Sequence, residues 1–256
     1  MHFGLEALGF LTSRAGSRDK PPDTVGSHGC GHASCPAGAP AIGFNASDPR
    51  LNYVHSFPVT AIKQGIEVTG PQLWNGTKPE LALTGPNVGS NVDFQLPFSG
   101  TVGAATYAAH TADIPAIAFS GATGNPTAWN ETTPHYSEVY AHLALNVTTT
   151  IINSGTPYLP KNTFLNVNFG TVSLDKCRNA SDFQFIFTRI HAGLKFFRDA
   201  QWCDSRRLPR EAHVLRMNNH CYVTISPGDA SDKTTVNDAS VQTQIIDKLK
   251  PILSCL

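Results

Sequence analysis

The stretch that most constrains how this chain can fold is residues 84–101, TGPNVGSNVDFQLPFSGT. It follows an apolar run at 81–83 and leads into a run of small residues at 102–110. A strand that passes through a Gly/Asn/Ser loop into a helix is a common anion site of α/β proteins, because loop N–H groups and the positive end of the helix dipole converge. The same residue types also suit plain turns and helix caps. The pattern therefore predicts the strand–loop–helix unit and leaves both uses of the loop open.

Apolar periodicity predicts further helices and strands along the chain. A strand at 116–119 closely follows the helix at 101–110, and this order predicts parallel strands joined by a right-handed crossover. Residues 138–152 give the clearest helix, with an apolar side chain at every fourth residue from Val139 to Ile151. The remaining predicted elements are a helix at 59–66, strands at 81–83, 164–169, 183–193 and 221–226, and a helix at 242–253 that Pro251 interrupts. Together these elements predict an α/β protein with parallel strands.

The composition favours a loop-rich extracellular protein. Lys plus Arg and Asp plus Glu both number 19, so the net charge favours neither a nucleic-acid polymer nor a membrane as a partner. Only 15% of the residues are charged, and the 256 residues include 21 Gly and 18 Pro. No apolar run approaches the roughly 18 residues of a membrane span. A chain of this length has room for one domain with a substantial core.

Five Asn-x-Ser/Thr sequences favour export, because they are acceptor sites for N-glycosylation in secreted proteins. Their asparagines are Asn45, Asn75, Asn130, Asn146 and Asn179. The N-terminus does not have the pattern of a signal peptide, since its apolar stretch is short and interrupted by a glutamate. We therefore predict a secreted glycoprotein whose first residues carry no recognisable export signal.

The six cysteines are even in number and spread along the chain, which is compatible with three disulfide bonds of unknown connectivity. Near the start, His28, Cys30, His32 and Cys35 leave three interpretations open. Imidazole and thiolate groups are good zinc ligands, but the H-x-C-x-H-x-x-C spacing matches no common zinc module. The two cysteines otherwise form a disulfide, with each other or with distant cysteines, or stay unpaired in an irregular segment.

Five motifs carry a resemblance to a known family. They are PELALTGPNVGSN at 79–91, SGTVGAA at 99–105, IPAIAFSG at 114–121, LNVNF at 165–169 and YVTISP at 222–227. Together they resemble the SurE family of metal-dependent phosphatases, and most of all its fungal secreted branch of acid phosphatases. The resemblance covers roughly residues 36–256. Its most specific part is the N-x-G-x-N loop followed at a fixed distance by SGTV.

The resemblance implies a fold and a domain organisation. The expected fold is an α/β three-layer sandwich, α/β/α, around a mostly parallel sheet. An extended β-hairpin region is expected in the charged excursion between the strands at 183–193 and 221–226, where family members form subunit contacts of a homo-oligomer. Residues 1–36, rich in Gly, Ser, Pro and His, are expected to be irregular. Residues 37–256 are expected to form a SurE-like domain without the family's first strand, first helix and second strand.

The resemblance also assigns residues to a site. Asn87 matches a metal-ligating asparagine of the family, which uses a divalent ion such as Mg²⁺ or Mn²⁺. Asn91, Ser99, Gly100 and Thr101 match the catalytic loop and helix start that contact the phosphate of a phosphate-ester substrate. These neutral groups suit a phosphate even without a metal, because N–H and hydroxyl groups bind tetrahedral anions.

The main metal ligands of the family are absent from this sequence. Family members begin with a strand that ends in Asn-Asp-Asp-Gly, and neither this motif nor any adjacent Asp pair occurs here. Asp93 is either a substitute ligand or a solvated loop carboxylate. Residues 228–234 lack the histidine that many family members carry there. His110 and His142 lie on predicted helices, where exposed or structural roles are commoner than catalysis.

Two classes of function follow from these observations. In the first, the chain is a metal-dependent phosphomonoesterase, an acid phosphatase or nucleoside 5′-monophosphate phosphohydrolase, whose activity is impaired or lost because the Asp pair is absent. In the second, it is a non-catalytic SurE-like fragment or a secreted interaction glycoprotein with weak anion binding. Whether the chain is an enzyme depends on whether it recruits a metal ion through other residues.

Overall fold

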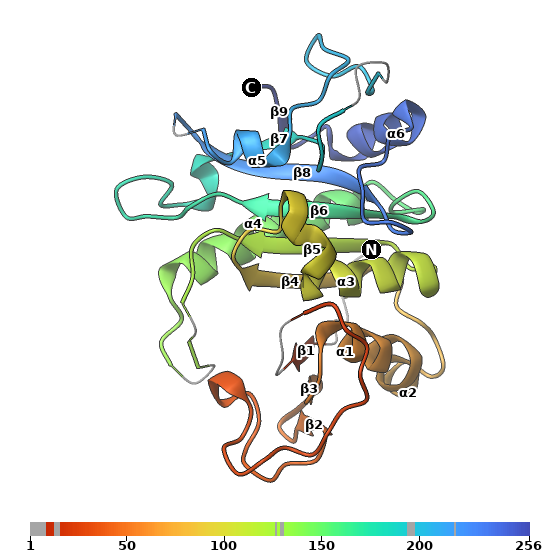
Figure 1. Ribbon diagram of the computed structural model, residues 1–256, viewed down its shortest axis with the longest axis vertical. Coiled ribbons are helices and arrows are strands. Elements are labelled where there is room, and N and C mark those ends of the chain that lie inside the picture. Colours follow the sequence, from red (N-terminus) through yellow and green to blue (C-terminus); the bar gives the residue numbers. More distant parts are fainter. Residues whose placement is uncertain (1–8, 13–15, 126, 129–130, 194–197, 218) are drawn as a thin grey trace.

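A six-stranded β-sheet forms the centre of the protein in the computed structural model (Figure 1). The structure describes residues 9–12, 16–125, 127–128, 131–193, 198–217 and 219–256. The strand order across the sheet is β4-β5-β6-β8-β7-β9. The strands are β4 (Ala82–Val88), β5 (Ala116–Gly121), β6 (Thr163–Phe169), β7 (Phe183–Phe187), β8 (Cys221–Asp229) and β9 (Leu253–Ser254). Within the described residues, β4 is therefore an edge strand.

Neighbouring strands of this sheet are mostly parallel, as predicted. β4, β5 and β6 run in the same direction, and β7 is parallel to both β8 and β9. β8 runs antiparallel to β6. In the excursion between β7 and β8, the described residues form one short antiparallel bridge, between Trp202 and Ser205. These residues do not form the extended hairpin that the resemblance implied.

Helices cover both faces of the sheet, and the predicted three-layer α/β/α arrangement is confirmed (Figure 1). On one face α3 (Gly100–Thr106) packs over β4, β5 and β6, and α1 (Pro58–Gln64) packs on α3. On the other face α4 (His135–Asn153) and α6 (Ala239–Leu249) contact each other and share one hydrophobic core with the strands. No helix in the described part of the chain has the length and apolarity needed to span a bilayer.

Alternating side chains give each face of the sheet its own core. In β5, Ile117 and Phe119 belong to the core beneath α4 and α6, whereas Ala116 and Ala118 belong to the core beneath α3. The four side chains are almost completely buried. Burial on both faces is typical of parallel strands covered by helices on either side.

Residues before β4 form a smaller three-stranded sheet, which lies beyond β4 in Figure 1. In this sheet β1 (Gly9–Thr12) is parallel to β3 (Asp48–Val54), and β2 (Ile42–Asn45) is antiparallel to β3. Residues 1–36, expected to be irregular, therefore contain one short strand where the structure describes them. The domain boundary at residue 36 stays a prediction.

The helices predicted at 59–66 and 101–110 are present, and both continue through a π-helical turn. The short elements are the 3₁₀ turns Gly31–Ala33, Asp93–Phe98 and Ala180–Asp182, the π turns Gly65–Thr69 and Tyr107–Thr111, and the helices α2 (Gly70–Leu73) and α5 (Glu211–Val214). The helix predicted at 242–253 ends earlier, at Leu249. Pro251 accounts for this end, because a proline has no backbone N–H to donate to the carbonyl group four residues before it.

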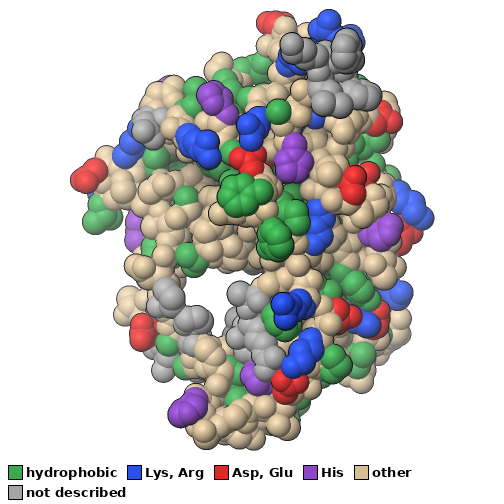
Figure 2. Space-filling model, viewed as in Figure 1, with side chains coloured by type: hydrophobic (Ala, Val, Ile, Leu, Met, Phe, Trp, Pro, Cys, Tyr) green, Lys and Arg blue, Asp and Glu red, His purple; other side chains and the backbone are tan. Residues whose placement is uncertain are grey.

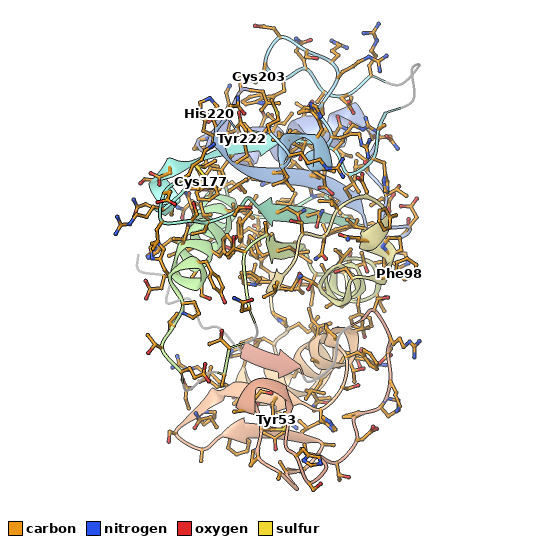
Figure 3. The ribbon with its side chains drawn as sticks, turned by 60° about the vertical axis from the view of Figure 1, so that its left-hand side comes forward. Tyr53, Phe98, Cys177, Cys203, His220 and Tyr222 are labelled. Atoms are coloured by element: carbon orange, nitrogen blue, oxygen red, sulfur yellow. A yellow bond between two sulfur atoms is a disulfide. The ribbon has the colours of Figure 1, made fainter. Side chains whose placement is uncertain are left out.

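Three disulfide bonds join the six cysteines. They are Cys30–Cys35, Cys177–Cys221 and Cys203–Cys255. The Cys30–Cys35 bond decides between the three interpretations of this cysteine pair that the sequence left open: the two cysteines bond to each other and do not bind a metal. The other two bonds attach the loop before β7 to the start of β8, and the excursion to the residue that follows the last strand (Figure 3).

Removing the bond that closes the longest of these loops is expected to destabilise the fold most. Cys203→Ser with Cys255→Ser opens a loop with a sequence separation of 52 residues, which should lower the free energy of unfolding by about 4 kcal/mol. Opening Cys30–Cys35, with a separation of 5 residues, should lower it by only about 2 kcal/mol, because a short loop restricts the unfolded chain less. Urea unfolding of the two double variants measures both losses. Equal losses would contradict the loop-length explanation.

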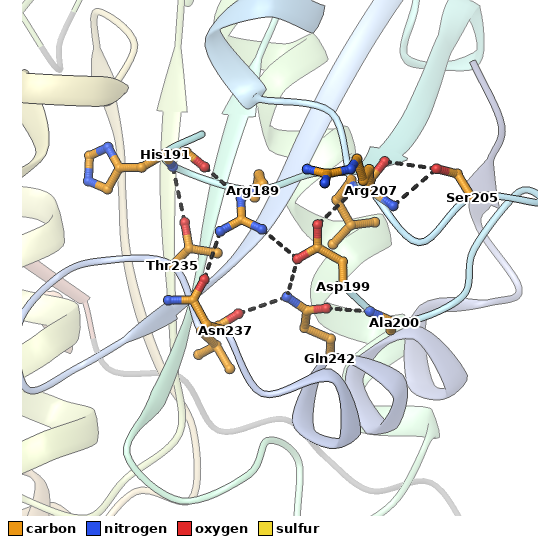
Figure 4. Close-up of polar contacts among 11 residues, drawn as sticks. Arg189, His191, Asp199, Ala200, Ser205, Arg207, Thr235, Asn237 and Gln242 are labelled. Carbon is orange, nitrogen blue, oxygen red and sulfur yellow. Dashed lines mark hydrogen bonds and ion pairs between the residues drawn. The ribbon is translucent and has the colours of Figure 1, made fainter. Parts of the chain in front are cut away.

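A buried ion pair anchors the excursion between β7 and β8 (Figure 4). Arg189 Nη1 lies 2.5 Å from Asp199 Oδ1, and the two side chains are only 5% and 6% exposed. Arg189 Nη2 donates to Asn237 Oδ1 (2.7 Å), and Gln242 Nε2 on α6 donates to Asp199 Oδ1 (3.0 Å). These contacts fix the excursion to α6 and to the segment that precedes it.

Candidate functional site

The loop at the end of β4 brings two of the predicted site residues into direct contact. Asn91 Nδ2 donates to Asn87 Oδ1 (2.8 Å), and Ser120 Oγ at the end of β5 donates to the same oxygen (2.8 Å). Asn87 Nδ2 donates in turn to the carbonyl oxygens of Val88 (3.0 Å) and Gly89 (2.9 Å). Both ends of the Asn87 amide are therefore engaged within the protein.

A glycine allows this loop to start so close to β5. Gly85 has a φ of +88°, which favours glycine, and a Cβ at this position would lie 2.1 Å from the carbonyl oxygen of Phe119. The register between β4 and β5 shifts here, between Thr84 and Asn87. The backbone at Gly85 thus turns β4 so that Asn87 meets Ser120.

Asn91 is buried and held by β6. Its backbone N–H donates to Asn168 Oδ1 (2.7 Å), and its carbonyl oxygen accepts from Asn168 Nδ2 (3.1 Å) and Asn166 Nδ2 (2.9 Å). Its own side-chain amide reaches Asn87 and Ser120. Asn91 therefore connects the loop to β5 and β6 through both its backbone and its side chain.

The other predicted site residues lie together at the start of α3. Ser99 Oγ caps the helix by accepting from the N–H of Val102 (3.1 Å). The carbonyl oxygen of Thr101 accepts from Thr84 Oγ1 (2.9 Å), which ties the helix start to β4. A Cβ on Gly100 would lie 2.6 Å from the carbonyl oxygen of Gly16, so the N-terminal segment covers one side of the first turn. The predicted residues thus form two groups, joined through β4.

The connection between these two groups is an exposed 3₁₀ turn, Asp93–Phe98. Phe94 and Phe98 are 79% and 76% exposed. Hydrophobic side chains gather at the centre of the face in Figure 2, and Figure 3 shows Phe98 on the side of the sheet that carries α3. Asp93 pairs with Arg210, with 2.5 Å between Oδ1 and Nη2. Asp93 is therefore an ion-pair partner of Arg210 at a partly exposed position of the loop.

A layer of buried polar side chains lies on the α3 side of the sheet, towards the carboxyl ends of β5 and β6. It consists of Ser120, Asn166, Asn168, Thr224 and Ser226, each with 0% exposure. In β5 the same face carries Ala116 and Ala118 nearer the amino end. One face of the sheet is therefore apolar at one end and polar at the other, and the polar end supports the loop that contains Asn87 and Asn91.

Glu211 is the acidic member of this layer. It begins α5 and is completely buried. Its carboxyl oxygens accept from Asn166 Nδ2 at 3.1 and 3.0 Å, and Oε2 also accepts from Ser226 Oγ at 2.7 Å. Burial raises the pKa of Glu211 to about 8, although the two hydrogen-bond donors oppose the shift. Burial therefore favours the protonated, uncharged form of Glu211.

The side chains around Asn87 do not fit a divalent metal ion. Mg²⁺ and Mn²⁺ need several hard oxygen ligands, usually including carboxylates. The groups in contact with Asn87 Oδ1 are an amide and a hydroxyl that donate hydrogen bonds to it. The described part of the chain contains no cluster of three or more His, Cys, Asp or Glu side chains suited to a metal. The predicted role of Asn87 as a metal ligand stays a prediction.

Four residues of the site were not predicted from the sequence, namely Ser120, Asn166, Asn168 and Glu211. The two asparagines alternate with Leu165 and Val167 in an otherwise apolar strand, and this alternation was an available signal for a polar face. Ser120 likewise ends the apolar run AIAFS. Glu211 follows an irregular excursion, so no local pattern indicated that it is buried.

Other residues singled out in the sequence lie away from this loop or on the surface. Asn45, Asn75, Asn146 and Asn179 are exposed, as glycosylation requires, and Asn130 lies outside the described residues. His110 Nδ1 lies 2.7 Å from Asn162 Oδ1, and His142 is exposed on α4. Glycosylation stays a prediction.

The comparison with known families agrees with this architecture. The sequence model of the family described as "Survival protein SurE" matches residues 22–192, which is more than half of the 256-residue chain. This chain belongs to the SurE family.

Individual relatives carry the names of phosphatases and nucleotidases. "Acid phosphatase" of Yarrowia lipolytica is 32% identical over 178 residues, covering 66% of this chain and 49% of that protein. "5′-nucleotidase SurE" of Pelobacter propionicus is 36% identical over 115 residues, covering 45% of this chain and 40% of that protein. "5′-nucleotidase SurE" of Alkaliphilus metalliredigens is 32% identical over 184 residues, covering 68% of this chain and 65% of that protein. The chain spans less than half the length of the first two relatives.

Among solved structures, the SurE protein from Aquifex aeolicus is similar to this chain. The TM-score is 0.48 and the sequence identity is 20%, with 80% of this chain and 79% of that chain covered.

Proposed function

We propose that this chain binds the phosphate group of a phosphate ester at residues 87–91 and at the start of α3. The reaction named for its relatives, phosphomonoester hydrolysis, is impaired or lost in this chain. The observation that carries the proposal is the position of the N-x-G-x-N loop, at the carboxyl ends of β4 and β5, where open α/β sheets bind their ligands. The helix start at Ser99, Gly100 and Thr101 provides the second group of contacts.

The chemistry of these groups supports anion binding. Backbone N–H groups at a helix start, with the hydroxyl groups of Ser99 and Thr101, stabilise negative charge on phosphate oxygens. The same groups would stabilise the additional charge of a phosphoryl-transfer transition state. The neutral amides and hydroxyl around Asn87 neither lower the pKa of an attacking water molecule nor accept its proton. Binding is therefore better supported than turnover.

Proteins of this family are generally metal-dependent, and a divalent ion such as Mg²⁺ or Mn²⁺ would need ligands beyond Asn87. We further propose that the protein is secreted and N-glycosylated and that it forms homo-oligomers. The three disulfide bonds favour an oxidising compartment. The exposed sequon asparagines and the fungal acid phosphatase among the relatives support the same location.

A second candidate function is that of a secreted interaction glycoprotein without catalysis. The observation that favours it is the pair Phe94 and Phe98, whose rings are mostly exposed beside the loop. Large exposed apolar side chains that gather on one surface often mark interaction sites.

Phosphate binding and turnover are tested separately. Inorganic phosphate added to ¹⁵N-labelled protein should shift the backbone amide signals of residues 87–91 and 99–102. Hydrolysis of p-nitrophenyl phosphate with Mg²⁺ or Mn²⁺ should be no faster than hydrolysis after chelation with EDTA, because the described residues supply no carboxylates around Asn87.

Turnover that is abolished by both EDTA and Asn87→Ala would show that the chain is an active metal-dependent phosphatase. Asn153→Ala, on the exposed end of α4 on the opposite face, is the matched control. The absence of phosphate-dependent shifts in both segments would overturn the proposed binding function.

A further inference from the structure

The orientation of one buried amide connects Glu211 to the candidate site. Asn166 Nδ2 donates to the carboxyl oxygens of Glu211 (3.1 and 3.0 Å) and to the carbonyl oxygen of Asn91 (2.9 Å). Its other end, Asn166 Oδ1, is buried without a hydrogen-bond partner. An unpaired buried acceptor is unfavourable, so the two acceptors on the Nδ2 side must determine how the amide points.

Rotating the Asn166 side-chain amide by 180° would not give its unpaired oxygen a better environment. A flip of Asn166 places Oδ1 against the carbonyl oxygen of Asn91, so that two acceptor oxygen atoms with no hydrogen between them face each other. Only the observed orientation lets one NH₂ group serve both acceptors. Glu211 and the loop residue Asn91 are therefore linked through a single donor group.

We propose that Glu211 is a positioning residue, whose carboxyl group orients Asn166 and thereby holds the Asn91 loop in place for anion binding. The inference rests on the proposed function, because the loop is the proposed anion site. Glu211 itself does not contact the loop: it acts through Asn166, which reaches the carbonyl oxygen of Asn91. Asn91 in turn donates to Asn87 (2.8 Å).

The groups that face Glu211 allow an uncharged carboxyl group. The hydroxyl of Ser226 donates to Oε2 of Glu211 (2.7 Å) and lies 2.7 Å from Thr188 Oγ1, so the groups around the carboxyl group are themselves uncharged. The charged groups that act on Glu211 are Asp93, which raises its pKa, and Arg210, which lowers it. Arg210 is paired with Asp93, so it does not serve as a full counter-ion to Glu211.

Ionisation of Glu211 at high pH would therefore disturb this arrangement. Burial raises its pKa to about 8, so the carboxylate forms only above that pH and then lacks a cation to compensate its charge. A buried, uncompensated carboxylate favours rearrangement towards water. The amide of Asn166 and the Asn91 loop would be released with it.

The experiment compares wild type with Glu211→Gln and Glu211→Leu. Gln resembles the protonated acid, and Leu removes the acceptor while keeping a similar volume. The first readout is hydrogen exchange of the Asn91 backbone amide, which donates to Asn168 Oδ1. The second is the affinity for sulfate, a tetrahedral dianion whose charge does not change between pH 6 and 9, measured by chemical-shift titration.

At pH 6.5, Glu211→Gln should match wild type in both readouts, whereas Glu211→Leu should speed Asn91 exchange and weaken sulfate binding by about tenfold, the usual effect of losing one such hydrogen bond. Between pH 6.5 and 9, sulfate affinity should fall more for wild type than for Glu211→Gln. Glu138→Gln, exposed on α4 on the opposite face, is the matched control and should follow wild type at every pH.

Unchanged Asn91 exchange in a folded Glu211→Leu protein would overturn the inference, as would equal pH dependence of sulfate affinity in wild type and Glu211→Gln. Should Leu prevent folding, the comparison of wild type with Gln still decides the question. Failure of the proposed function has a different signature. In that case wild type binds neither sulfate nor phosphate at any pH, while Asn91 exchange still responds to Glu211.

Discussion

Replacing Arg189 by methionine is expected to lower the free energy of unfolding by about 3–5 kcal/mol, the range found when one partner of a buried ion pair is removed. The substitution leaves Asp199 buried with an uncompensated negative charge, since its side chain is only 6% exposed. The remaining donors to Asp199 are neutral: Gln242 Nε2 at 3.0 Å and the N–H of Leu208 at 2.9 Å. Urea-induced unfolding at constant pH measures the loss.

The chain offers a matched control for this substitution. Arg210 pairs with Asp93 at the same distance of 2.5 Å, but the Arg210 side chain is 45% exposed. Arg210→Met should therefore lower stability by at most about 1 kcal/mol. Combining Arg189→Met with Asp199→Leu removes both charges and should recover most of the loss, because no unpaired charge remains. Equal losses for the two arginine variants would contradict the role of burial.

The second large effect is a dependence of stability on pH that originates at Glu211. Its pKa is about 8 in the folded protein and 4.5 for an unperturbed group, so the folded state binds the proton more tightly than the unfolded state. The contribution of Glu211 to the free energy of unfolding is then fully present below pH 4.5 and is lost as the pH rises towards 8. The loss amounts to at most about 1.4 kcal/mol per pH unit in this window.

Glu211→Gln should remove this contribution, because glutamine does not titrate. The stability of the variant relative to wild type should therefore increase steadily between pH 5 and 8 and become constant above pH 8. Urea midpoints at four pH values in this range suffice to measure the slope. Glu138→Gln, exposed on α4, should leave the wild-type slope unchanged. Parallel curves for wild type and Glu211→Gln would show that Glu211 ionises normally in the folded state.

The sequence predicted the elements whose signals are local. The strand–loop–helix unit at residues 84–101, the helix at 138–152 and the strand at 164–169 carry their patterns within a few turns of chain, and the structure confirms all three. The contact between Asn87 and Asn91 was not predicted, although the two residues lie only four positions apart in one loop.

What the sequence did not predict depends on contacts between distant segments. Glu211 is buried because β6 and β8 bring Asn166 and Ser226 together beside it, and no local pattern encodes that meeting. The pairing of Asp93 with Arg210 joins residues 117 positions apart. In the described part of the excursion, the buried contacts of Arg189 likewise join segments far apart in the sequence, such as Asn237 and α6.

The polar layer beneath the loop also has a consequence for how this protein can evolve. Five buried amide and hydroxyl side chains occupy positions of the sheet where aliphatic residues would pack without any need for hydrogen bonds. Replacing a hydrogen-bonded pair by apolar groups of the same shape is nearly neutral or stabilising. Selection for thermal stability alone would therefore erode this layer. The chain keeps a less robust sheet than its architecture allows, which is the trade-off expected if the proposed anion site is retained for binding.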